Sequence, residues 1–97
     1  MDNIFNLNQN IHFAILDPEY KTHALKAYDF LIKNNYSVYW NYKFNLKKSL
    51  SIANEKNANY VVIIGESENS NDNFSVKNLK NGNQEIKNLS NLLDAIK

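Results

Sequence analysis

The chain has 97 residues, no cysteine, and a formal net charge of +1 that comes from 11 basic and 10 acidic side chains. A chain of this length builds one small domain, and the absence of cysteine excludes disulfides, thiolate metal sites and cysteine nucleophiles. The near-neutral charge gives no global field that would attract nucleic acid, and the absence of arginine excludes bidentate guanidinium contacts.

No segment has the pattern of a membrane span or a signal peptide. The longest apolar run, residues 60–64, is far shorter than the ~20 residues that cross a bilayer, and the polar start of the chain lacks a basic region followed by a hydrophobic stretch. We therefore expect no membrane partner and a cytoplasmic location, with an organelle as the open alternative. Residues 1–10 are interpreted as a linker or tail, and residues 11–97 as the folded domain.

The first part of the domain predicts a strand, a helix and a second strand. Apolar residues at 11–16 form the strand. Asp17 is expected to cap the following helix with Pro18 in its first position, and apolar side chains spaced by three and four continue that helix. The helix is expected to end where Asn35 can adopt the left-handed backbone of a cap. The alternating segment 36–40 is the second strand.

The second part predicts one more helix, a central strand and a hairpin. Asn45 is expected to cap a helix at 46–56, and the consecutive apolar residues 60–64 indicate a strand that is covered on both faces. The remaining expected elements are strands at 74–79 and 84–87, a tight turn at 81–82 between them, and a final helix that carries the leucines of 89–96.

This order of elements predicts the topology. Two right-handed crossovers make the first three strands parallel and place helices on both faces of the sheet. The fourth strand then runs antiparallel and the fifth parallel again. We predict an α/β fold of three layers, α/β/α, with a mixed five-stranded sheet and three helices.

Open α/β sheets bind ligands outside the carboxyl ends of their strands, but nothing there indicates catalysis or a cofactor. The first strand is followed by Asp17-Pro18-Glu19 in place of the glycines that cradle phosphate, so a flavin or dinucleotide site is disfavoured. His12 and His23 lack neighbours at triad or metal-ligand spacing. Glu66 and Glu68 have no evident partner site as an acid–base pair. We assign no catalytic residue and no metal to this chain.

An RNA site explains the polar residues around the central strand better. Glu68 follows that strand, and Lys77 lies on the strand expected to pair beside it. A carboxylate can accept both donors of a guanine Watson–Crick edge, which is accessible in unpaired RNA loops. Lys77 would then neutralise a phosphate or donate to a base carbonyl, and Glu66 lies in the same loop.

The start of the second helix is a candidate phosphate site. Its lysines, with Asn45 as the cap, lie in a stretch that has no acid from 42 to 54, where both charge and helix dipole favour phosphate. Tyr42 is the aromatic residue nearby that we expect to stack on a base, whereas Trp40 is expected in the core. An ordinary solvated helix start is the alternative. The basic candidates here are Lys43, Lys47 and Lys48.

The chain resembles the C-terminal anticodon-binding domain of histidyl-tRNA synthetase, a class II aminoacyl-tRNA synthetase. The resemblance extends over about residues 11–97 in the family's order and spacing. Its most specific part is Gly-Glu-x-Glu at 65–68 followed by Val-Lys-x-Leu-x-x-Gly-x-Gln at 76–84. Further matching residues are those at 45–48, 53, 58–64 and 85.

The resemblance implies that this domain is non-catalytic and binds the histidine tRNA anticodon stem-loop, which contains guanines, in support of aminoacylation. It implies that Glu68 and Lys77 contact anticodon bases and that 41–45 lies nearby. Segment 41–44 has no glycine where many relatives carry one. The resemblance therefore does not imply RNA contacts from this segment, and those expected of Tyr42 and Lys43 rest on the residues alone. ATP and Mg²⁺ would belong to the catalytic domain of the parent enzyme, itself expected to be a homodimer, with no cofactor here.

Two interpretations of the whole chain remain at this point. The start at Met1, followed by a polar segment, favours a domain taken from a longer ligase over a separate protein. The alternative function is a stand-alone protein-interaction or regulatory module that reuses the fold, and the aromatic character of 39–44 suggests it.

Overall fold

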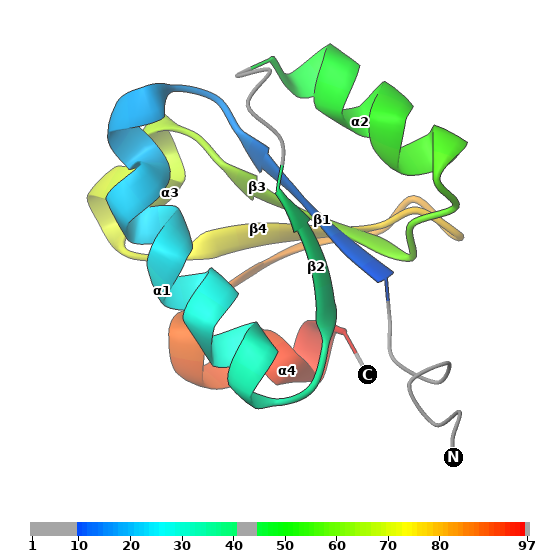
Figure 1. The fold of residues 1–97 in the computed structure, drawn as a ribbon. Coiled ribbons are helices and arrows are strands. Elements are labelled where there is room, and N and C mark those ends of the chain that lie inside the picture. Colours follow the sequence, from blue (N-terminus) through cyan, green and yellow to red (C-terminus); the bar gives the residue numbers. More distant parts are fainter. Residues whose placement is uncertain (1–9, 41–44, 97) are drawn as a thin grey trace.

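The computed structural model describes residues 10–40 and 45–96, and these form a five-stranded sheet with strand order β2-β1-β3-β4-β5 (Figure 1). The strands are β1 Asn10–Ile15, β2 Ser37–Trp40, β3 Tyr60–Ile64, β4 Phe74–Asn78 and β5 Gln84–Lys87. The helices are α1 Lys21–Lys33, α2 Leu46–Glu55, α3 Glu66–Asn71 and α4 Leu92–Ala95, with short 3-10 helices η2 Pro18–Tyr20 and η3 Leu89–Asn91.

The pairing of the strands confirms the predicted topology. β1 is parallel to both β2 and β3, so the apolar β3 lies at the centre of the sheet. β4 is antiparallel to β3, and β5 is antiparallel to β4 and hence parallel to the first three strands. The predicted fold class, a three-layer α/β domain with a mixed five-stranded sheet, is confirmed.

Two hydrophobic clusters lie on the two faces of the sheet, because β3 is apolar at consecutive positions and needs cover on both sides. The larger cluster joins the sheet to α1 and α4 and includes Phe13, Leu31, Val62, Phe74 and Ile96. The smaller cluster joins it to α2 and consists of Ala14, Ala53, Ala58, Val61 and Ile63. In Figure 1, α1 and α4 accordingly lie on one side of the sheet and α2 on the other.

The α2 side of the sheet is only partly covered. α2 packs over β1 and β3. On the same side, α3 contacts β4 through the hydrogen bond that the Ser75 hydroxyl donates to Glu68. The register pairs Ser75 with Ile86 and Lys77 with Gln84, and Ser75 also pairs with Ile63 of the α2-side cluster. Directly opposed residues share a face, so the side chains of Ser75, Lys77, Gln84 and Ile86 form one surface, here called the β4–β5 strip.

Local signals at the helix ends agree with the structure. The Asn45 carboxamide oxygen accepts a hydrogen bond from the Lys48 N–H at 2.9 Å and caps α2 as predicted. Asn35 has the predicted left-handed backbone, with φ of 67°. Asp17 caps the short turn η2 rather than α1 itself, and α1 follows directly at Lys21. Within the described residues no helix is long and apolar enough to cross a membrane.

Two further details differ from the sequence-based expectations. Residues 66–71, expected as a loop, form the short helix α3, which adds to the three expected helices. The β4–β5 connection is longer than the expected two-residue turn and contains residues 79–83, because Asn78 organises it. The Asn78 side chain accepts from the Lys80 N–H, and its carbonyl accepts from the N–H of Gly82, which has φ of +79°.

Candidate RNA-binding surface

Glu68 lies in the first turn of α3, and both of its carboxylate oxygens are held by the protein. Oε1 accepts a hydrogen bond from the Gly65 N–H at 2.8 Å, which closes the N-terminus of the helix. Oε2 accepts from the Ser75 hydroxyl of β4 at 2.6 Å. Glu68 is half-buried, and these two hydrogen bonds fix the orientation of its carboxylate. In a flexible loop the same carboxylate would have no fixed orientation.

Lys77 lies on the same face of β4 as Ser75, because alternate residues of a strand point the same way. Glu68 therefore reaches the β4–β5 strip at Ser75, and Lys77 follows two residues further along. Among the ion pairs of the described residues, none joins Glu68 to Lys77. Glu68 and Lys77 thus lie on one side of the sheet but do not pair with each other. Glu68 is a fixed hydrogen-bond acceptor, Lys77 is a half-buried cation, and Ser75 lies between them.

Glu66 does not converge with Glu68. Both residues belong to α3, and residues two apart on a helix are separated by about 200° around its axis. Glu68 points to Ser75, so Glu66 projects away from the strip, where it is exposed in the first turn. The two carboxylates therefore do not converge, and Glu66 is separated from the other base-reading candidates.

The start of α2 presents the predicted lysines to solvent. Lys47 and Lys48 are exposed, and the first turn has no acidic residue to neutralise them. Asn45 uses its carboxamide oxygen as the helix cap, which leaves its amide nitrogen as the group that can reach a ligand. The other two candidates of this region, Tyr42 and Lys43, lie outside the described residues.

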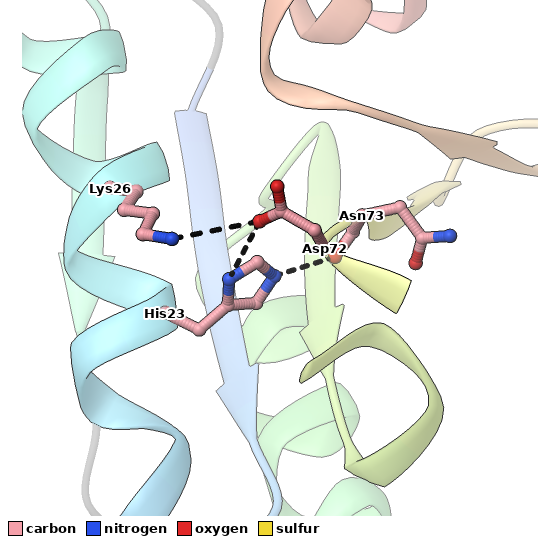
Figure 2. Close-up of polar contacts among 4 residues, drawn as sticks. All are labelled: His23, Lys26, Asp72 and Asn73. Carbon is pink, nitrogen blue, oxygen red and sulfur yellow. Dashed lines mark hydrogen bonds and ion pairs between the residues drawn. The ribbon is translucent and has the colours of Figure 1, made fainter. Parts of the chain in front are cut away.

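Both histidines are buried and pack against aromatic rings. His23 of α1 stacks on Phe74 with ring centroids 4.4 Å apart, and its Nε2 donates to the Asn73 carbonyl at 2.8 Å. Its Nδ1 lies 3.6 Å from the Asp72 carboxylate, which Lys26 also approaches at 3.6 Å (Figure 2). These contacts hold the end of α3 and the start of β4 against α1, so α3 is fixed at both of its ends.

His12 lies under the α2 side of the sheet with 2% of its surface exposed. Its ring packs against Tyr39 at 4.6 Å between centroids, and its buried Nδ1 has no hydrogen-bond partner among residues 10–40 and 45–96. Burial, followed by the positive charge of Lys56, lowers the pKa of His12 below the ordinary value of 6.5. The residues described by the structure contain no group of three His, Asp or Glu side chains that could hold a metal ion.

Comparison with known proteins places the chain in a family. The model of the family described as "Anticodon binding domain" matches residues 4–97. The chain belongs to this family. The resemblance to the anticodon-binding domain of histidyl-tRNA synthetase is thereby confirmed, since the curated relatives below carry that activity in their names.

The individual relatives agree in sequence and in fold. The chain is 34% identical to the histidine–tRNA ligase of Aquifex aeolicus over 85 residues, which are 87% of this chain and 21% of that protein. It is 52% identical to the Koribacter versatilis histidine–tRNA ligase over 42 residues, 43% of this chain and 10% of that protein. The crystal structure of histidyl-tRNA synthetase from Nostoc sp. PCC 7120 is similar with a TM-score of 0.80 and 27% identity, over 92% of this chain and 21% of that one.

The chain therefore spans about a fifth of the length of the Aquifex aeolicus ligase. Two residues of the surface were missed by the sequence analysis. Ser75 could have been found from the alternation of β4, which puts it on the face of Lys77. Ile86 required the register of β5 and the knowledge that α2 stops short of it, and no sequence signal supplies either.

Proposed function

We propose that this anticodon-binding domain serves a histidine–tRNA ligase and that Glu68 reads a guanine of the histidine tRNA anticodon. The observation that supports this most is the fixed carboxylate, because a carboxylate has about four lone-pair sites. Gly65 and Ser75 use two of them. The others are left to accept the two N–H donors of a guanine Watson–Crick edge, and Lys77 can donate to the base carbonyl or to a phosphate.

Phosphate contacts are assigned to Lys47 and Lys48. Both are exposed at the N-terminus of α2, where the helix dipole also favours an anion. Asn45 contributes its amide nitrogen there. We include Glu66 as a further contact because it belongs to the Gly-Glu-x-Glu signature at 65–68, and Tyr42 and Lys43 because the sequence places an aromatic ring and a cation just before α2.

At the level of the parent enzyme, the proposal adds a catalytic domain that uses ATP and Mg²⁺, assembles as a homodimer and works in the cytoplasm. These statements rest on the family resemblance and stay predictions for this chain. The alternative, a stand-alone interaction module, is not favoured, since the family model covers residues 4–97 and the curated relatives are ligases.

The test compares two anticodon stem-loops that differ in one group. Inosine in place of the anticodon guanine removes the 2-amino donor that Glu68 would accept. We expect the domain to prefer the guanine loop by about 1–2 kcal/mol in dissociation constants measured by fluorescence anisotropy. Glu68→Gln should remove the preference while keeping the helix, because the Gln oxygen can accept from Gly65 and its amide can donate to Ser75.

The two failures of this experiment have different meanings. Equal affinity of the unmodified domain for both loops would contradict guanine reading. Absence of RNA binding, together with a tight dimer in analytical ultracentrifugation, would instead support the interaction module.

A further inference from the structure

Ile86 is the most exposed of the large apolar side chains in the described part of the chain, with 66% of its surface accessible. It lies on the edge strand β5 and pairs directly with Ser75, the residue that holds Glu68. Opposed side chains of antiparallel strands are about 4.5–5.5 Å apart at Cβ. Ile86 therefore neighbours the residue that binds the fixed carboxylate.

The neighbours of Ile86 on the strip are polar and include both hydrogen-bond donors and acceptors. The adjacent cross-strand pair is Lys77 with Gln84, which supplies an ammonium donor and a carboxamide that both donates and accepts. On the opposite face of β5, Glu85 and Lys87 pair with each other at 3.3 Å. The charges of β5 are thus directed away, and the strip side of this strand keeps one apolar and one neutral polar side chain.

This arrangement fits an unpaired nucleobase. A base has an apolar face and a polar edge, and the strip offers Ile86 for the face with Glu68, Lys77 and Gln84 around it for the edge. A protein partner fits less well, because a stable interface buries ~800 Å² on each partner around a hydrophobic centre, whereas one isoleucine interrupts this polar strip. The strip is also continuous with the carboxylate assigned to guanine.

We propose that Ile86 is the floor of a nucleobase subsite on the β4–β5 strip, where one unpaired RNA base lies against its side chain with its edge toward Glu68 and Gln84. The inference rests on the proposed function and extends it. The Ile86 side chain would add binding affinity without discriminating between bases. Packing on Ile86 alone would accept any base, and the edge contacts would select among them.

The test uses two isoleucines that differ in position. Ile86→Ala should weaken binding of the anticodon stem-loop by about fivefold, near the lower limit of the stacking contributions known for aromatic platforms. The control is Ile32→Ala on α1, where the isoleucine is 43% exposed on the other side of the sheet, and it should leave the dissociation constant unchanged. Ile86→Phe should restore or increase affinity, because an aromatic ring stacks on a base.

Salt dependence gives a second readout. Because Ile86 releases no counterion, the loss caused by Ile86→Ala should be the same at 50 and at 200 mM salt, roughly the range in which phosphate contacts change strongly. Circular dichroism spectra of the variants should match that of the unmodified domain.

Unchanged affinity in Ile86→Ala, while Glu68→Gln still loses its preference for guanine over inosine, would overturn the subsite and leave the proposed function intact. Equal losses in Ile86→Ala and Ile86→Phe would also overturn it. Absence of stem-loop binding by the unmodified domain would contradict the proposed function itself.

Discussion

Two of the acceptor positions of the Glu68 carboxylate are used inside the protein, and this makes the residue both a helix cap and a candidate base reader. The capping contact with Gly65 builds α3, and the contact with Ser75 ties α3 to β4. Ser75 is 2% exposed, so its hydroxyl is shielded from competing water. The orientation of the reading group thus depends on a residue that no base would touch.

Ser75→Ala should therefore change base selection as well as stability. Loss of the hydrogen bond to a partly exposed charged acceptor should lower the free energy of unfolding by about 1–2 kcal/mol. The preference for the guanine over the inosine loop should fall several-fold, because the carboxylate becomes mobile. Ser75→Thr keeps a hydroxyl and should recover the preference. A variant with lowered stability and a fully retained preference would show that Ser75 has only a structural role.

His12 predicts a pH dependence of stability. Its pKa is lowered in the folded state by burial and then by Lys56, so the folded protein binds fewer protons than the unfolded chain just below pH 6.5. The stabilising effect of the neutral ring is complete above pH 6.5 and is lost as pH falls toward the folded-state pKa. Urea unfolding between pH 5 and 7 should show this loss. His12→Phe should have a flatter profile, and an equally steep one would assign the effect to other groups.

At the level of elements, residues with a left-handed backbone show directly how residue type affects the stability of a turn or a helix end. Gly82 has φ of +79° in the β4–β5 connection, and a Cβ added there would meet no atom of the described residues within 4 Å. Gly82→Ala should then cost only backbone strain, about 1 kcal/mol in urea unfolding. Asn35→Gly, at φ of 67° after α1, is the matched change in the opposite direction and should be neutral or slightly stabilising. Equal effects of the two changes would contradict this explanation.

The elements that could be predicted are those whose signals are local. β3 is apolar at five consecutive positions, α1 has apolar residues at helical spacing, and Asn45 is a capping residue. α3 could not be predicted, since its six residues, Glu-Ser-Glu-Asn-Ser-Asn, have no apolar periodicity. It forms because distant contacts hold it: Ser75 at its start, and His23 near its end. The orientation of the Glu68 carboxylate depends on those same contacts, so it could not be predicted from the sequence either.

At the scale of the whole molecule, a net charge of +1 means that RNA affinity must come from local groups. Lys47→Ala with Lys48→Ala should weaken binding of guanine and inosine loops equally. The double change should also reduce the slope of log affinity against log salt by roughly 0.7 for each phosphate that is no longer neutralised. The control is Lys33→Ala on α1, where the lysine pairs with Asp29. An unchanged slope in the double variant would remove α2 from the interface.

The most direct measurement is an NMR titration of amide shifts with the histidine anticodon stem-loop, compared with the inosine-substituted loop. Guanine reading predicts shifts at Gly65–Glu68, at Ser75 and Lys77, at Ile86 and at the start of α2. Those at Glu68 and Ser75 should be reduced with inosine. Identical shifts with both loops, or shifts confined to the α1 face, would contradict the assignment of this surface as the anticodon site.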